Sequence, residues 1–262
     1  MNTHRVATVI RRHAYVLRRS PHRFFDVTFW PFMDVLVFGS LGAFVSRENA
    51  ATKAGTPYLL AGIMLFHVLF QVQVGVATGF LEETWSRNLL NVMTTPVTES
   101  EYALGIGVFG LAKLVMALVT LTVTGFVFYG FHLDRVGIAL IPAVAILLVF
   151  GWAISLVVIG LVLRFGPSAE ILTWGLNYVA LALSGVFNPI DALPGALQPV
   201  ARVFPSTRAF AAARNALDGH PLDWGNVAMG LFGALVAAAL GLWFVTTMLK
   251  VFRRRGFVTR FS

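Results

Sequence analysis

YLLAGIMLFHVLFQVQVGVATGF, residues 58–80, contains no Asp, Glu, Lys or Arg. A helix needs about 20 apolar residues to cross the hydrocarbon core of a bilayer, so this stretch predicts a transmembrane helix. Similar stretches lie on both sides of it along the chain. The six predicted spans are 25–45, 58–80, 102–131, 136–163, 169–187 and 227–249.

The composition supports this interpretation. The chain is 57% hydrophobic and 12% charged, with a mean hydropathy of +0.77, whereas soluble proteins carry about 25% charged residues. Too few polar side chains are present to cover a water-soluble core, so a lipid bilayer is the expected solvent. We therefore predict an all-α integral membrane protein that forms a single transmembrane domain over residues 1–262.

Positive charge is concentrated at the two ends of the chain. The net charge is +8, but the basic residues do not gather on one globular face, which argues against a nucleic-acid partner. With six spans both ends lie on one side, and that side carries 13 Lys and Arg residues against six on the other. The positive-inside rule then places both termini in the cytoplasm, with the plasma (inner) membrane as the expected location.

Residues 4–20 have the pattern of an amphipathic, interfacial helix ahead of the first span. Its apolar stripe at helical spacing comprises Val6, Val9, Ile10, His13, Val16 and Leu17. Arg5, Arg12 and Arg19 repeat on another face. Such a helix lies in the membrane surface with its arginines at anionic lipid headgroups, and docking to a partner is the alternative. Ser20 followed by Pro21 predicts that a new helix begins there and enters the membrane.

The cytoplasmic loop after the second span reads EETWSRNLLNVMTTPVTESE (82–101). A short helix is predicted over 82–93. Its apolar stripe comprises Trp85, Leu89 and Met93. Thr98 and Glu101 then form a capping box that begins the third span. The loop is therefore predicted to form a short helix parallel to the membrane. From the residues alone a plain interfacial linker is the expected role, and transmission of a push from a cytoplasmic partner is the alternative.

The connection between the fifth and sixth predicted spans is apolar but repeatedly broken by proline. Its halves, 192–204 and 207–217, are too short to cross the membrane. We predict a re-entrant helical hairpin over 192–217, whose exposed backbone must face protein or water. Three basic residues fall at its rim: Arg202, Arg208 and Arg214. They are expected to anchor to lipid phosphates, with binding of an anionic substrate group as the alternative.

Few ionisable side chains fall inside the spans. Asp34 and Lys113 do, and either they pair with each other or Lys113 extends to the membrane surface. The six histidines show no metal-ligand spacing and cysteine is absent, so no metal site is predicted. A Gly-x-Gly-x-x-Gly motif at 105–110 lies inside a span, where close helix packing explains it better than dinucleotide binding, as it does for the glycines at 75–79. The sequence has no phosphate-binding loop and so no ATPase site of its own.

Three segments resemble, in this order, the permease subunit of type-2 ABC exporters, the family that includes drug, nodulation-factor, O-antigen and teichoic-acid permeases. They are the basic helix 4–20, the stretch 58–105 with its Glu-rich helix, Thr-Pro and Glu, and SGVFNPIDALPGALQPVARVFPSTRAFAAAR (184–214). The resemblance covers nearly the whole chain. It implies a permease that moves a drug-like, lipid or glycan substrate out of the cytoplasm by alternating access.

The resemblance also implies partners and residue roles. Two permease chains, identical or different, would pair in the membrane, with two copies of a cytoplasmic ABC ATPase that bind ATP and Mg; no cofactor is implied for this chain. The 82–93 helix corresponds to the coupling helix, with Glu82, Glu83, Trp85, Arg87 and Leu89. The outer gate corresponds to the hairpin, with Asn188, Pro189, Arg202, Arg208 and Arg214. Asn188 replaces the aromatic or apolar residue expected before Pro189, so the resemblance does not determine which residues line the gate.

Two other functions are compatible with the sequence. A membrane-embedded lipid-modifying enzyme would use the three hairpin arginines against a phosphate, but no cluster of acid, base and metal-binding residues accompanies them. An ion-coupled secondary transporter often has broken spans at matching positions in both halves, whereas this chain has one broken region. An ATPase gene beside this one would favour the exporter.

Overall fold

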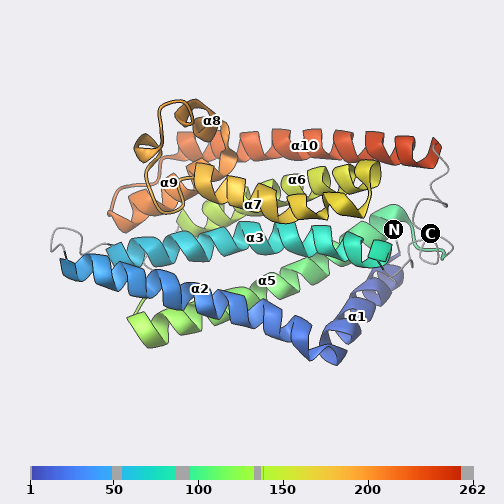
Figure 1. Cartoon of the computed structure of the whole chain (residues 1–262), viewed down its shortest axis with the longest axis horizontal. Helices are drawn as coiled ribbons and strands as arrows, with labels where there is room; N and C mark the ends of the chain where they lie inside the picture. The colour runs from blue at the N-terminus through green and yellow to red at the C-terminus, as the bar shows by residue number, and fades with distance from the viewer. Residues whose placement is uncertain (1, 49–54, 86–94, 133–136, 138, 255–262) are drawn as a thin grey trace.

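The computed structural model describes residues 2–48, 55–85, 95–132, 137 and 139–254. All regular structure within these residues is helical, as predicted (Figure 1). The elements are α1 (Thr3–Arg19), α2 (Pro21–Glu48), α3 (Gly55–Trp85), α5 (Glu99–Tyr129), α6 (Leu140–Phe165), η3 (Pro167–Glu170), α7 (Ile171–Leu183), η4 (Ile190–Ala192), α8 (Gln198–Val203), α9 (Pro205–Leu217) and α10 (Trp224–Arg254). Five helices in this part of the chain are long and apolar enough to cross a membrane: α2, α3, α5, α6 and α10.

The remaining predicted span, 169–187, is shorter than expected. It forms the end of the short η3 helix and then α7, whose 13 residues measure about 20 Å along the axis. The hydrocarbon core is about 30 Å thick. Gly166 and Gly185 flank this region with φ values of 85° and 66°, which suit glycine and end a regular helix. Six spans are therefore not confirmed among the described residues.

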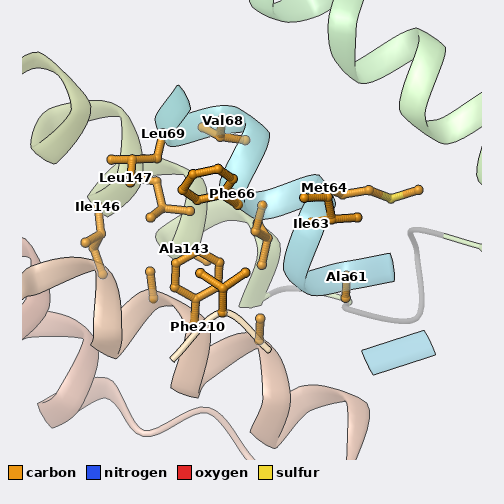
Figure 2. Close-up of a cluster of buried hydrophobic side chains, with 14 of the residues drawn as sticks. Ala61, Ile63, Met64, Phe66, Val68, Leu69, Ala143, Ile146, Leu147 and Phe210 are labelled. Atoms are coloured by element: carbon orange, nitrogen blue, oxygen red, sulfur yellow. The ribbon is translucent and has the colours of Figure 1, made fainter. Parts of the chain in front are cut away.

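Helix α3 lies at the centre of the bundle (Figure 1). It packs against α2, α5 and α6 and also contacts α7 and α9. In its membrane-spanning stretch 78% of the residues are buried, compared with 28% in α2 and 22% in α10. Figure 2 shows the apolar core beside it, where Leu69 of α3 belongs to one cluster with Leu147 of α6 and Phe210 of α9. Helix α3 is therefore shielded by protein, while α2 and α10 expose apolar surface.

Small residues bring α3 close to α5, as predicted for the glycines at 75–79. A Cβ atom added at Gly75 would lie 3.7 Å from Cα of Gly110, and one added at Gly79 would lie 2.9 Å from Ile106. Such close backbone approach strengthens dispersion contacts between membrane helices. A Cβ atom at Gly107 would meet no described atom within 4 Å, so Gly107 makes no such close approach to the described helices of this chain.

The segments singled out in the sequence lie at opposite ends of the bundle. Helix α1, the end of α3, the start of α5 and the end of α10 share one end (Figure 1). The elements η4, α8 and α9 gather at the other end (Figure 1). Helix α2 begins at Pro21 directly after Ser20, which confirms the predicted restart of the helix.

Candidate coupling and gating sites

The start of α5 carries the predicted capping box. The hydroxyl Oγ1 of Thr98 accepts the backbone N–H of Glu101 at 3.3 Å, and Oε2 of Glu101 accepts the backbone N–H of Thr98 at 3.0 Å. These bonds satisfy N–H groups that the first turn of a helix leaves without partners. The prediction is confirmed, and α5 therefore begins at a fixed point after the 82–101 loop.

Glu101 has further partners that the sequence did not indicate. Its Oε1 accepts the backbone N–H of Asn2 at 2.6 Å, and its Oε2 lies 3.6 Å from a guanidinium nitrogen of Arg5. The backbone N–H groups of Thr98 and Asn2, followed by Arg5, lower the pKa of Glu101 from 4.5 to about 2. A lowered pKa stabilises the fold fully above about pH 4.5, and this contribution is lost as the pH falls toward 2. Glu101 is therefore ionised at physiological pH.

Helix α1 packs on α5 through part of its predicted apolar stripe. Val6, Val9 and His13 are buried, and the imidazole of His13 stacks on the ring of Phe109 with centroids 5.5 Å apart. A Cβ atom added at Gly105 would lie 2.7 Å from Cβ of Val9. Three members of the stripe thus face protein, so α1 is a packed element of the bundle as well as an amphipathic one.

The coupling residues implied by the resemblance fall at the edge of the described structure. Glu82, Glu83 and Trp85 continue α3 without a break, so the predicted 82–93 helix does not begin separately at residue 82. The side chains of these three residues, and residues Arg87 and Leu89 altogether, lie outside the described part of the chain. The structure therefore places the backbone at 82–85 at the α1 end of the bundle (Figure 1).

The intramembrane charges have other neighbours than the predicted ones. A carboxylate oxygen of Asp34 lies 3.4 Å from Nε2 of His67 on α3. The ammonium of Lys113 lies 5.2 Å from the centroid of the Phe109 ring. The structure thus brings Asp34 together with His67, a pairing that the sequence does not indicate because both residues lie in apolar stretches far apart along the chain.

Helix α7 faces the bundle with a polar stripe and faces outward with apolar side chains. Thr173 and Asn177 are buried, and Nδ2 of Asn177 donates a hydrogen bond to Oε1 of the buried Gln73 on α3. Ser155 of α6 donates to the backbone carbonyl of Gln73 at 2.9 Å. The ring of Trp174 is half-exposed and lies 5.9 Å from the ring of Phe70 on α3, whereas Ile171 is exposed on the outer side of α7. A side-chain hydrogen bond and apolar contacts therefore both hold α7 to α3.

Arg214 of α9 fastens the end of α7. Its guanidinium donates hydrogen bonds to the backbone carbonyls of Gly185 and, at 3.5 Å, Asn188. The same group lies 5.7 Å from the centroid of the Tyr58 ring on α3. Gly185 and Asn188 belong to the connection that follows α7, so Arg214 joins this connection to both α9 and α3.

The other two hairpin arginines have separate partners. Arg208 donates to Oδ1 of Asn226 on α10 at 2.5 Å, and the exposed Arg202 pairs with Asp191 at 3.5 Å. The three guanidinium groups do not share a site, so this geometry gives no support to an enzyme that clamps a phosphate with them. Within the described residues no group of three or more His, Cys, Asp or Glu side chains could hold a metal ion.

The connection from α7 to η4 closes against α3. Asn188 and Pro189 in this connection are exposed, while the backbone before them turns inward. A Cβ atom added at Gly62 of α3 would lie 2.5 Å from the carbonyl oxygen of Val186. The predicted hairpin follows as α8 and α9, which meet at Phe204. Its second half matches 207–217 closely, while its first half forms a helix only over 198–203.

Comparison with known proteins identifies the family of the chain. The model of the family described as ABC-2 type transporter matches residues 4–217. The match therefore includes α1, the spans α2, α3, α5 and α6, helix α7 and the α8–α9 hairpin. No curated protein sequence matches the chain significantly.

Proposed function

The chain belongs to the ABC-2 type transporter family as a permease subunit, and from this premise we propose that it forms the membrane pathway of an ATP-driven exporter. The observation that carries the proposal is the polarity of the bundle. Helix α1 and the ends of α3 and α5 that flank the coupling loop share one end, and the broken hairpin occupies the other (Figure 1). A bilayer between these ends places the coupling loop on one side of the membrane and the hairpin, as the proposed gate, on the other side.

The proposed cycle assigns a step to each end. Two permease chains pair, and a cytoplasmic ATPase docks on each of them at residues 82–93. Binding of ATP and Mg closes the ATPase pair and pushes the coupling loop, and α3 and α5 carry this movement across the membrane. The contacts of Gly62 with Val186 and of Arg214 with α7 then loosen, which opens the outer side to a drug-like, lipid or glycan cargo.

The exporter is tested by reconstitution with the candidate ATPase. We expect the permease to copurify with the ATPase and the complex to hydrolyse ATP faster when cargo is present. Replacing the lysine of the phosphate-binding loop in the ATPase should abolish transport into proteoliposomes. Transport by the purified permease alone, driven by an ion gradient, would instead support the secondary transporter.

Cysteine labelling tests the proposed topology, since the natural chain contains no cysteine. An Ala196→Cys variant, at an exposed position before α8, should react with an impermeant maleimide in intact cells. The matched Ala14→Cys variant, exposed on α1, should react only after permeabilisation. The reverse pattern would place the hairpin in the cytoplasm and contradict the proposal.

A further inference from the structure

One carboxylate serves the N-termini of two helices. Glu101 caps its own helix α5 through Thr98 and also accepts the backbone N–H of Asn2, the N-cap residue of α1. The side chain of Asn2 in turn accepts the backbone N–H of His4 at 3.0 Å. The first turns of α1 and α5 are therefore joined by one continuous set of hydrogen bonds.

The carboxylate is well placed for this role. Its side chain is 3% exposed, so water competes little for its oxygen atoms. Charge-assisted hydrogen bonds to backbone N–H groups are roughly twice as strong as neutral ones. Arg5, one turn into α1, balances the charge at 3.6 Å. Oε1 of Glu101 therefore binds the start of α1 at Asn2, and Oε2 binds the start of α5 at Thr98 and lies near Arg5 of α1.

Packing extends the joint along α5. Val9 lies against Gly105, one turn after Glu101, and His13 stacks on Phe109, one turn further. Because Gly105 has no side chain, the backbone of α1 can pack closely against α5 at this position. Helix α1 thus follows the first turns of α5, and its other end leads through Ser20 directly into α2.

We propose that Glu101 is a positioning residue that makes α1 and the start of α5 move as one body, so that displacement of the coupling loop reaches α2 as well as α5. The joint itself follows from the hydrogen bonds of Glu101 and the packing of α1 on α5. Its part in coupling rests on the proposed function. Helix α1 then acts as a bridge between two spans that leave the same end of the bundle.

Spin labels on the cysteine-free chain measure the joint directly. Labels at Tyr15→Cys on α1 and Leu111→Cys on α5 occupy exposed positions. We expect a narrow distance distribution in the parent complex and a broad one in Glu101→Ala. Glu101→Gln keeps a hydrogen-bond acceptor and should give an intermediate width. Asp26→Ala, which removes an exposed acid near the start of α2, should leave the distribution narrow. An unchanged distribution in Glu101→Ala would overturn the proposal.

A transport measurement then tests the coupling role. In the reconstituted permease–ATPase complex, Glu101→Ala should lower cargo moved per ATP by about fivefold, the low end of measured coupling effects, without lowering basal hydrolysis. Should Glu101→Ala fail to fold, Arg5→Ala provides a milder lesion, with exposed Arg11→Ala on the same helix as its control. A broadened distribution with unchanged cargo per ATP would overturn the coupling role. A parent complex without any ATP-dependent transport would refute the exporter, while the distance measurement would still decide the joint.

Discussion

Replacing Glu83 by arginine is expected to lower ATP-driven transport by at least about tenfold while the permease still inserts in the membrane. Glu83 lies on the last turn of α3, in the segment that we propose docks in a groove of the ATPase. Reversal of a charge at an interface costs several kcal/mol when it meets a like charge, and each 1.4 kcal/mol corresponds to a factor of about ten in affinity. The end of α3 is continuous with the buried centre of the bundle. A weaker contact between this end and the ATPase would therefore reduce the movement that α3 transmits across the membrane.

The measurement compares transport and ATP hydrolysis in proteoliposomes. Asp26→Arg is the control, because it reverses an exposed acid near the start of α2, outside the predicted coupling segment. We expect Asp26→Arg to retain transport and Glu83→Arg to lose both transport and cargo-stimulated hydrolysis. Normal export by Glu83→Arg would exclude a coupling role for this residue.

Gly62→Val is expected to give the largest loss of stability at the end of the bundle that carries the α8–α9 hairpin. A Cβ atom at this position would lie 2.5 Å from the carbonyl oxygen of Val186, and backbone cannot yield as the tip of a flexible side chain can. Overpacking of this kind costs about 1–3 kcal/mol, which lowers the melting temperature of a chain of this size by about 5 °C. The connection after α7 must then move away from α3, which disrupts the hydrogen bond from Arg214 to the carbonyl of Gly185.

Gly107→Val provides the matched control for this substitution. It makes the same chemical change inside α5, where an added Cβ atom would meet no described atom within 4 Å. We compare the thermal unfolding of both variants in detergent and then the transport activity of the reconstituted complexes. A loss in Gly62→Val alone would show that the contact with Val186 is responsible, and not a general effect of replacing a helical glycine with valine. Equal melting temperatures for Gly62→Val and the parent would show that the closure is not tightly packed.

Local chemistry was predictable from the sequence. The apolar stretches gave five of the long helices, and the pair Thr98 and Glu101 gave the capping box because both partners lie within one turn. The restart at Pro21 was predictable for the same reason. Hydropathy did not reveal the shortness of α7, since the average over 169–187 is insensitive to a single glycine with positive φ at residue 185.

Pairings across the bundle were not predictable in the same way. A pair between Asp34 and Lys113 was one of two alternatives because both are charged, whereas the neighbour of Asp34 is His67. Arg214 carried the prediction of a lipid anchor, yet its guanidinium contacts the carbonyl of Gly185 and the ring of Tyr58. These contacts depend on how helices distant in sequence approach each other, and a single sequence contains no direct measure of that.

Helix α7 is about 10 Å shorter than the hydrocarbon thickness of an average bilayer. Hydrophobic mismatch of this kind is relieved by local thinning of the lipid, at a cost of a fraction of a kcal/mol per Å. Where α7 borders lipid, we expect the neighbouring acyl chains to shorten or disorder more than beside the longer helices α5 and α10. We therefore expect the acyl-chain length of the host membrane to influence the protein most strongly at α7.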